Sequence, residues 1–231
     1  MNLDNHIIWM CWFQGIDNLM NDTKNSICYN SWLKNSHHKN FILLHDDNIK
    51  EYAPEYYDII NNSPYRRIQA KSDLLRLILL EKYGGTWTDA SVYCNQKFEE
   101  IFFNTVNETN FFTYRFVPRS ITDKGNKETT SWYITNNNPN DHLIKSWKNL
   151  FISKYTNHDY EWKLFTIHNT LCELYDTDDA IKSTINNMVQ INENIPHSAN
   201  KGKSCEYSFL YKRPNIFHLK LFENREKFFN D

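Results

Sequence analysis

"KSDLLRLILLEKYGGTWTDAS", residues 71–91, carries the strongest structural signal in the chain. Its apolar residues recur at helical spacing, which predicts a helix capped at its start by Ser72 and ended by Gly84. A second glycine, Gly85, stands directly before a strand-like stretch. The chain has only 5 glycines in 231 residues, so an adjacent pair indicates a tight corner where a side chain would not fit.

Charged and polar side chains lie on both sides of this corner. Asp73 and Arg76 are three residues apart and share one face of the predicted helix. Alternation along the strand places Trp87, Asp89 and Ser91 on one face. Oxygen ligands two residues apart suit a divalent cation shared with a diphosphate, and a guanidinium suits phosphate oxygens. The alternative is a capped helix with a surface ion pair and a glycine stop.

The sequence outside this stretch predicts an α/β fold. "HIIWMCWF" at 6–13 and "FILLH" at 41–45 read as buried strands joined by a helix over 18–34. This β-α-β order favours a parallel sheet with ligands beyond the carboxyl ends of the strands, where Gln14 and residues 45–48 would lie. We expect further strands at 110–116 and 130–135, helices over 143–151 and 162–171, a polar loop at 192–208 and a strand or extended arm at 215–222.

Composition limits the partners that the chain can have. The 26 Lys and Arg residues nearly balance the 28 Asp and Glu residues, for a formal net charge of -2. We therefore expect no nucleic-acid partner. The 5 cysteines are odd in number and contain no CxxC pair, which favours a reducing cytoplasm. No run approaches the ~20 apolar residues that span a bilayer, so we expect at most peripheral membrane association.

The central motif runs A-x-S-D-x-x-R, then an apolar helix, then Y-G-G-x-x-x-D-A-S. It resembles the sugar-nucleotide-binding core of capsular polysaccharide synthesis glycosyltransferases. The same core is shared by yeast-type initiating mannosyltransferases and by the catalytic domains of large clostridial toxins. "IIWMCWFQG" at 7–15 is similar to the first strand of the capsular group, and "FHLKLF" at 217–222 resembles its terminal His-Leu-Lys element. The residues that match the central motif are Ala70, Ser72, Asp73, Arg76, Tyr83, Gly84, Gly85, Asp89, Ala90 and Ser91.

The resemblance implies a GT-A type fold, a Rossmann-like central mixed sheet flanked by helices, in a single domain over residues 1–231. It implies a retaining glycosyltransferase that moves a sugar from a nucleoside-diphosphate-sugar, with UDP expected, to a saccharide acceptor in bacterial capsule or surface polysaccharide synthesis. A lipid-linked acceptor and the inner face of the cell membrane are expected. Ser91 stands where many relatives have a second carboxylate, so a non-catalytic sugar-nucleotide or glycan binding module is an alternative. A sugar-phosphate transferase is another.

The resemblance also assigns roles to residues of the motif. Asp73, Arg76 and Asp89 are the expected catalytic residues: Asp73 would bind sugar hydroxyls, Arg76 would contact the sugar and the diphosphate, and Asp89 would bind the ribose or the metal. A divalent cation, Mn²⁺ or Mg²⁺, is expected on Asp89, Ser91 and His218.

Substrate contacts are expected at the rim of the site. Trp12 is the preferred stacking surface for the nucleobase, with Trp9 and Gln14 beside it on the first strand. A basic cluster, "YKRP" at 211–214, lies next to the polar loop and is a candidate lid over the diphosphate. The other substrate-binding candidates are Ser72, Gly85, Trp87, Ser91 and Lys220.

Overall fold

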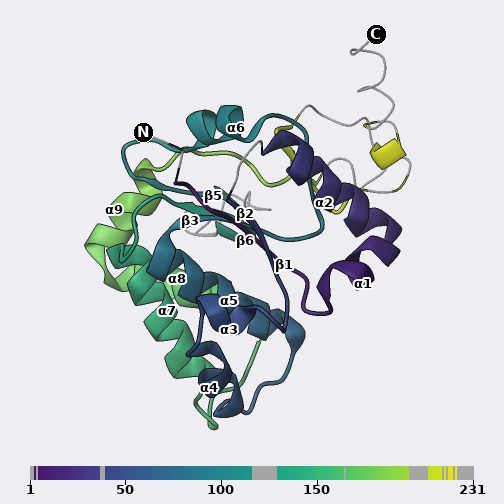
Figure 1. Ribbon diagram of the computed structural model, residues 1–231. Helices are drawn as coiled ribbons and strands as arrows, with labels where there is room; N and C mark the ends of the chain where they lie inside the picture. The colour runs from purple at the N-terminus through teal and green to yellow at the C-terminus, as the bar shows by residue number, and fades with distance from the viewer. Residues whose placement is uncertain are drawn as a thin grey trace.

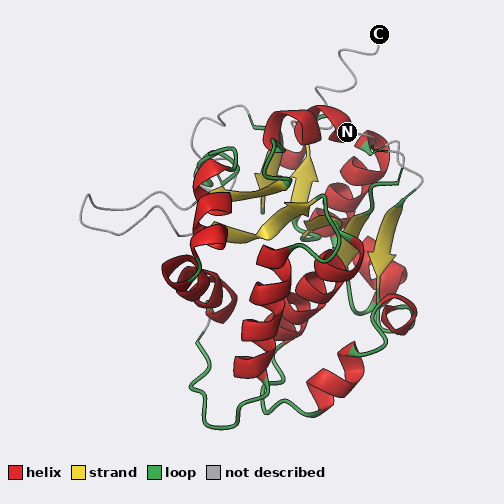
Figure 2. Cartoon of the chain, turned by 90° about the vertical axis from the view of Figure 1, so that its left-hand side faces the viewer, coloured by secondary structure: helices red, strands yellow, loops and turns green. Residues whose placement is uncertain are grey.

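The computed structural model describes residues 3, 5–36, 40–115, 129–163, 165–197, 208–214, 216, 218–220 and 222. In this part of the chain a central sheet lies between two layers of helices (Figure 1). Figure 2 shows the same strands from the side, enclosed by helices. The expected α/β class with a central mixed sheet flanked by helices is therefore confirmed.

The central sheet has five strands in the order β2-β1-β3-β6-β5. Strand β1 (Ile8–Cys11) pairs in parallel with β2 (Phe41–Leu44) and with β3 (Gly85–Thr88). Strand β6 (Thr129–Asn136) is antiparallel to both β3 and β5 (Phe111–Arg115). The carboxyl ends of β1, β2 and β3 therefore meet at one edge of the sheet, as the β-α-β prediction required.

Helices cover both faces of this sheet. The predicted helix over 18–34 is in fact two helices, because the carboxylate of Asp22 accepts hydrogen bonds from the amides of Lys24 and Asn25 and starts a new helix there. The described helices are α1 (Gly15–Asn21), α2 (Thr23–Asn35), α3 (Ile49–Tyr52), α4 (Tyr56–Asn61), α5 (Ile68–Tyr83), α6 (Phe98–Thr105), α7 (His142–Tyr155), α8 (Thr166–Thr177) and α9 (Asp179–Asn187).

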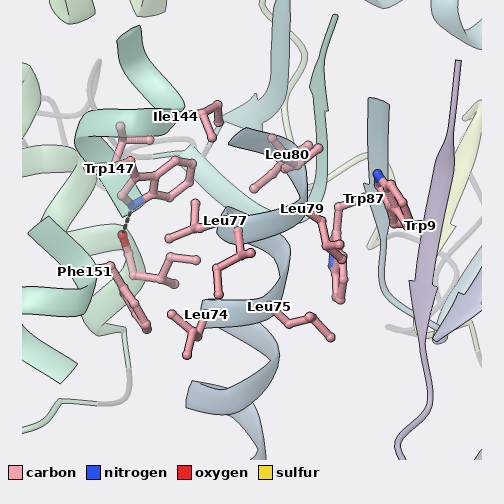
Figure 3. Close-up of a cluster of buried hydrophobic side chains, with 14 of the residues drawn as sticks. Trp9, Leu74, Leu75, Leu77, Leu79, Leu80, Trp87, Ile144, Trp147 and Phe151 are labelled. Atoms are coloured by element: carbon pink, nitrogen blue, oxygen red, sulfur yellow. Dashed lines mark hydrogen bonds between the residues drawn. The ribbon is translucent and has the colours of Figure 1, made fainter. Parts of the chain in front are cut away.

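Two hydrophobic cores lie on opposite faces of the sheet. Successive residues of a strand point to opposite faces, so Ile8 and Met10 pack with Trp32 of α2 in one core, whereas Trp9 packs in the other with α5. Helix α5 is buried on all sides along its middle, as Figure 3 shows between Trp147 and Trp87. A helix that is apolar all round belongs inside a domain.

Helix α5 begins earlier than its sequence suggested. It starts at Ile68, after Arg67 in extended conformation, so Ser72 lies within the second turn. The prediction of Ser72 as the N-cap is wrong. Ala70 is buried in the core beneath the first turn, and this packing extends the helix toward its N-terminus. Ser72 is thereby placed one turn before Arg76, on the same face.

The glycine pair forms the predicted tight corner. Gly84 ends α5 with φ +68°, and Gly85 opens β3 with φ +95°. A Cβ at Gly85 would lie 2.3 Å from the carbonyl oxygen of Ile7. The same carbonyl accepts a hydrogen bond from the amide of Thr86 at 2.8 Å. Gly85 therefore allows β3 to lie directly against the start of β1.

A second, two-stranded sheet lies beyond the corner. The predicted continuous strand after Gly85 ends at Thr88, turns through 89–91 and resumes as β4 (Val92–Cys94). Strand β4 pairs antiparallel with β7 (Leu210–Lys212), far along the chain. The described residues of 215–222 are helical, so the prediction of a strand or extended arm there is wrong. Residues 198–207 of the predicted polar loop lie outside the described residues.

In the part of the chain that the structure describes, none of the helices has both the length and the apolar character needed to cross a bilayer.

The corner generates a stability prediction. We expect Gly85→Ala to lower the free energy of unfolding by at least about 3 kcal/mol, because the added Cβ meets a fixed backbone carbonyl and the conformation is one that alanine avoids. Gly15→Ala is the matched control, since Gly15 has φ +82° but open space where the Cβ would be. It should lose only about 1–2 kcal/mol. Urea unfolding measures both, and equal losses would contradict the steric account.

Candidate active site

Four charged side chains meet where β3 ends. Asp73 and Arg76 come from α5, Asp89 from the turn after β3, and Lys212 from the end of β7. The Arg76 guanidinium lies 3.1 Å from the carboxylate of Asp73 and 3.2 Å from that of Asp89. The Lys212 ammonium lies 2.6 Å from the other oxygen of Asp89. The predicted convergence of the acid and guanidinium of the helix with the aspartate beyond the corner is therefore present in the structure.

Arg76 connects three parts of the fold. Its Nη1 donates to the carbonyl oxygen of Ser131 at 2.6 Å and faces Asp73, while its Nη2 donates to Ser72 Oγ and to Asp89 Oδ1, each at 3.2 Å. Its side chain is only 5% exposed. The terminal nitrogens of this guanidinium thus serve partners inside the protein, and Arg76 positions both carboxylates. Contact with a sugar or a diphosphate stays a prediction for this residue.

Asp89 is held as an anion by the donors around it. Trp87 Nε1 donates to Oδ1 at 3.0 Å, next to the Arg76 contact, and Lys212 donates to Oδ2. Burial opposes ionisation of this carboxyl, but the charges of Lys212 and Arg76 and the hydrogen bonds outweigh it, so the pKa of Asp89 lies below its ordinary value of 3.8.

Asp73 has the opposite electrostatic character. Burial raises the pKa of Asp73 from 3.8 to about 6, the negative charge of Asp89 adds to this rise, and Arg76 opposes it. Its side chain is 13% exposed, against 27% for Asp89. The two carboxylates therefore differ in charge in weakly acidic solution: Asp89 is ionised, while Asp73 carries a proton below about pH 6.

Lys212 was not singled out as a site residue by sequence reasoning. Its Nζ donates to Ser91 Oγ at 2.9 Å as well as to Asp89, and it lies 123 residues after Asp89 in the chain. The only signal was the basic cluster at 211–214, which was interpreted as a lid over the diphosphate. The structure places this lysine in the strand that pairs with β4, in contact with Asp89; the lid over the diphosphate stays a prediction.

The donor set for the expected metal does not suit a divalent cation in this arrangement. Asp89 and Ser91 converge, as predicted, but the Lys212 ammonium contacts both of them. His218 is buried and stacks on Phe222 at 6.2 Å, against the aromatic cluster of β4 and β7. Within the described residues, no group of three His, Cys, Asp or Glu side chains is arranged to hold a metal ion. The predicted Mn²⁺ or Mg²⁺ stays a prediction.

The first strand borders the site at its carboxyl end. Cys11 is the last residue of β1, and burial, the charge of Asp46 and that of Asp89 raise the pKa of its thiol, whereas Arg76 lowers it. Trp12 follows, half-buried, with its Nε1 donating to Asn18 Oδ1 at 2.9 Å. The next predicted contact, Gln14, is exposed.

Other predicted contacts have structural roles instead. Trp9 is fully buried and donates through Nε1 to the carbonyl oxygen of Gly84 at 3.0 Å, so the prediction that it meets a nucleobase is wrong. Trp87 is 1% exposed, lies under the Arg76 guanidinium at 5.1 Å and orients Asp89. It offers no ring surface to a substrate, which corrects its assignment as a substrate contact.

The last two candidates are also placed by the structure. Gly85 faces the carbonyl oxygen of Ile7 rather than a ligand, so its role is the corner, and its assignment as a substrate contact is corrected. Lys220 is exposed on the C-terminal helical segment, with no hydrogen bond or ion pair to any described residue. Its substrate-binding role stays a prediction.

His168 of α8 lies near enough to the cluster to interact with the charges of Arg76 and Asp89. Burial lowers its pKa to about 4, the charge of Arg76 lowers it further, and Asp89 opposes the shift. Its ring lies edge-on to Phe165 at 5.4 Å. The imidazole is therefore neutral near pH 7 and adds no positive charge to the cluster.

The two carboxylates predict opposite effects of pH on stability. The folded-state pKa of Asp73 is raised, so wild-type protein loses stability from this group as pH rises from 3.8 to about 6. We expect the free energy of unfolding of Asp73→Asn, relative to that of wild type, to rise across this window by about 3 kcal/mol, with no further change above it. Urea unfolding at a series of pH values measures the difference.

Asp89→Asn is the matched comparison. In wild type the folded-state pKa of Asp89 is lowered. Asp89 therefore contributes stability that is fully present above pH 3.8 and is lost as the pH falls through the folded-state pKa. The variant should be less stable than wild type at neutral pH, and the deficit should close in acid. If the stability difference from wild type changed in the same direction with pH for both variants, the electrostatic assignment would be contradicted.

Two of the solved structures that resemble the chain are described as transferases. "PaToxG Glycosyltransferase" aligns with a TM-score of 0.49 at 15% sequence identity, over 78% of this chain and 72% of its own. A structure described as a transferase mutant aligns with a TM-score of 0.38 at 12% identity, over 76% of this chain and 87% of its own. Likenesses of this degree establish neither substrate nor mechanism. No curated protein sequence matches the chain.

Comparison of the sequence with known protein families assigns the chain more clearly than the solved structures do. The pattern described as "Capsular polysaccharide synthesis protein" matches residues 1–213, which include the whole motif from Ala70 to Ser91 and also Lys212. This match confirms the resemblance drawn from the motif and supports the expected class of enzyme, a glycosyltransferase. The chain therefore belongs to the family of capsular polysaccharide synthesis proteins.

Proposed function

We propose that the protein is a retaining glycosyltransferase that moves a sugar from a nucleoside-diphosphate-sugar, with UDP as the nucleotide, to a saccharide acceptor in surface polysaccharide synthesis. One observation carries the proposal. Asp73, Arg76, Asp89 and Lys212 form a single hydrogen-bonded cluster beyond the end of β3, in a chain that belongs to a capsule synthesis family. The retaining outcome and the GT-A type follow from the resemblance of the motif.

The reaction places a definite electrostatic demand on the site. The bond from the sugar's anomeric carbon to the diphosphate breaks, and a bond from that carbon to the acceptor oxygen forms. The hydroxyl proton of the acceptor passes to the departing diphosphate, so protons and charge balance. Negative charge grows on the diphosphate, and fixed positive charge beside it lowers the barrier. Arg76 and Lys212 are buried cations held in place by hydrogen bonds, as this role requires.

The carboxylates suit the sugar side of the donor. Asp73 is partly exposed next to Arg76, and a carboxyl group accepts or donates hydrogen bonds to sugar hydroxyls according to its protonation. Asp89 is fixed by Trp87, Arg76 and Lys212 and suits the ribose. In this proposal Trp12 and Gln14, beyond the end of β1, meet the nucleobase.

The acceptor belongs to the same proposal. Nucleotide sugars are charged donors used in aqueous solution, whereas a growing surface polysaccharide is built on a lipid. We therefore extend the proposal to a lipid-linked saccharide acceptor at the inner face of the cell membrane, reached by peripheral association.

The proposal is tested by a donor screen on the wild-type protein. Thermal unfolding is followed with UDP, GDP, CDP and ADP and with their sugars, because a ligand that binds only the folded state raises the melting temperature. Release of the nucleoside diphosphate and the mass and anomeric configuration of the product are then measured. Saturable binding without release would favour the binding module. A product that carries a phosphate would identify the sugar-phosphate transferase.

A nearly isosteric variant tests the site itself. We expect Asp73→Asn to lower kcat/KM for transfer by about 100-fold or more, because the carboxylate's charge and its acceptor capacity toward the sugar are lost. Asp58→Asn is the matched control: Asp58 is an exposed aspartate on α4, and its loss should leave transfer unchanged. Equal activity of the two variants would remove Asp73 from the proposed reaction.

Arg76→Ala is a poor test of catalysis. Arg76 is buried between Asp73 and Asp89, and its removal would leave two carboxylates without their shared cation. Breaking such a buried pair costs about 3–5 kcal/mol. Loss of activity in that variant would not separate catalysis from unfolding.

A further inference from the structure

We propose that Lys212 is the resident cation of the donor site, and that the protein binds its nucleoside diphosphate through this ammonium without a divalent metal ion. The inference rests on the proposed function and adds to it the identity of the charge that meets the diphosphate. It starts from the position of the Lys212 ammonium, which lies 2.6 Å from Asp89 Oδ2 and 2.9 Å from Ser91 Oγ.

Asp89 and Ser91 are the pair on which the sequence predicted a metal. The ammonium contacts both of these oxygens, in the place where a bridging cation would lie. A divalent cation such as Mg²⁺ takes about six oxygen ligands, and it is held in proteins chiefly by carboxylates and phosphates. Here the pair offers one carboxylate and one neutral hydroxyl. Two oxygen acceptors at these distances suit an –NH₃⁺ group, which has three donors to place.

The carboxylate has little capacity left for a metal. Oδ1 of Asp89 already accepts from Trp87 Nε1 at 3.0 Å and from Arg76 Nη2 at 3.2 Å, and Oδ2 accepts from Lys212. A metal bound at this carboxylate would lie close to two fixed positive charges. Like charges at such distances repel strongly in a partly buried site. The arrangement therefore disfavours a divalent cation at Asp89.

Lys212 is fixed in this position by its strand. In the pairing of β4 with β7, Lys212 stands opposite Val92, the residue after Ser91. Its own amide donates to the carbonyl oxygen of Pro196 at 2.9 Å, and the next amide, of Arg213, donates to the carbonyl oxygen of Ser91 at 2.8 Å. The backbone on both sides of the lysine is thus anchored. Its ammonium is a built part of the site and not a surface group that happens to lie nearby.

The ammonium keeps a donor for a ligand. Two of its three N–H groups are used by Asp89 and Ser91 among the described residues. The Nζ also lies 5.8 Å from the centre of the Trp132 ring, a cation–π contact that supplies no oxygen acceptor, and in this proposal the third N–H donates to a phosphate oxygen. The Lys212 side chain is itself 5% exposed, like that of Arg76, whereas the neighbouring Asp89 side chain is 27% exposed, so a ligand would reach the ammonium from the Asp89 side. Arg76, by contrast, has its terminal nitrogens occupied. Lys212 is therefore the better placed of the two cations to contact a diphosphate.

The wild-type protein supplies the first test. Affinity for UDP is measured by calorimetry in excess EDTA and again in MnCl₂. We expect the two affinities to agree within about twofold, a difference well below 1 kcal/mol. Binding that is about tenfold or more tighter with Mn²⁺ would overturn the inference while leaving the proposed transferase intact. If UDP, GDP, CDP and ADP all fail to bind in either condition, the proposed function and this inference fall together.

Variants of Lys212 supply the second test, in EDTA throughout. Lys212→Met keeps the length of the side chain without the charge and should weaken UDP binding about tenfold or more, the loss expected for a charged hydrogen bond. Lys212→Arg keeps the charge and should retain more affinity than Lys212→Met. Lys148→Met is the matched control, because Lys148 of α7 forms an ion pair at 3.0 Å with Glu81 of α5, outside the cluster. UDP affinity equal to wild type in Lys212→Met would overturn the inference.

Folding is checked separately for each variant by circular dichroism. If Lys212→Met does not fold, the comparison of EDTA with MnCl₂ in wild type and the affinity of Lys212→Arg decide the question. Paramagnetic resonance of Mn²⁺ adds a readout that needs no nucleotide. Wild type should leave the Mn²⁺ signal unchanged, whereas capture of Mn²⁺ that Asp89→Asn abolishes would overturn the inference.

Discussion

The arrangement of the site depends on one buried guanidinium. Arg76 lies between Asp73, Asp89 and the carbonyl oxygen of Ser131 and is 5% exposed. A charge in such a place is tolerated only when it is paired and its hydrogen bonds are made. The turn after β3 must therefore return to α5, and β6 must lie beside both. This requirement holds together the helix, the sheet edge and the site, and it explains why a charged residue interrupts the apolar run from Leu74 to Leu80 in the middle of α5.

The glycine corner makes this pairing possible. Chain reversal at Gly84 and Gly85 lets β3 start against the backbone of Ile7, and four residues of strand then carry the chain back along α5 to Asp89. A longer connection would leave the position of Asp89 less well defined. The short path also sets Trp87 between the two partners, under the guanidinium and bonded to the carboxylate. Packing and polar contacts thus specify the same geometry, which is typical of a preorganised site.

The cluster gives two carboxyl groups of the same kind, those of Asp73 and Asp89, different pKa values. Asp89 is surrounded by donors and cations, which lower its pKa, whereas burial dominates at Asp73 and raises its pKa to about 6. Two carboxyl groups of one site therefore have different protonation in weakly acidic solution. The difference arises from Lys212 and Trp87, which contact Asp89, and from the charge of Asp89, which raises the pKa of Asp73. A strand near the end of the chain thus determines the electrostatics of a motif near its middle.

The sequence by itself determined the α/β class, the glycine corner and the convergence of Asp73, Arg76 and Asp89, because each depends on spacing within a few turns of helix or residues of strand. Only the tertiary structure decided that Trp9 and Trp87 are buried, that α5 starts at Ile68, and that Lys212 contacts Asp89 and Ser91. The physical reason is the range of the interactions. Burial depends on which elements cover a side chain, and the pairing of β7 with β4 joins residues more than a hundred positions apart, a choice that no local pattern encodes.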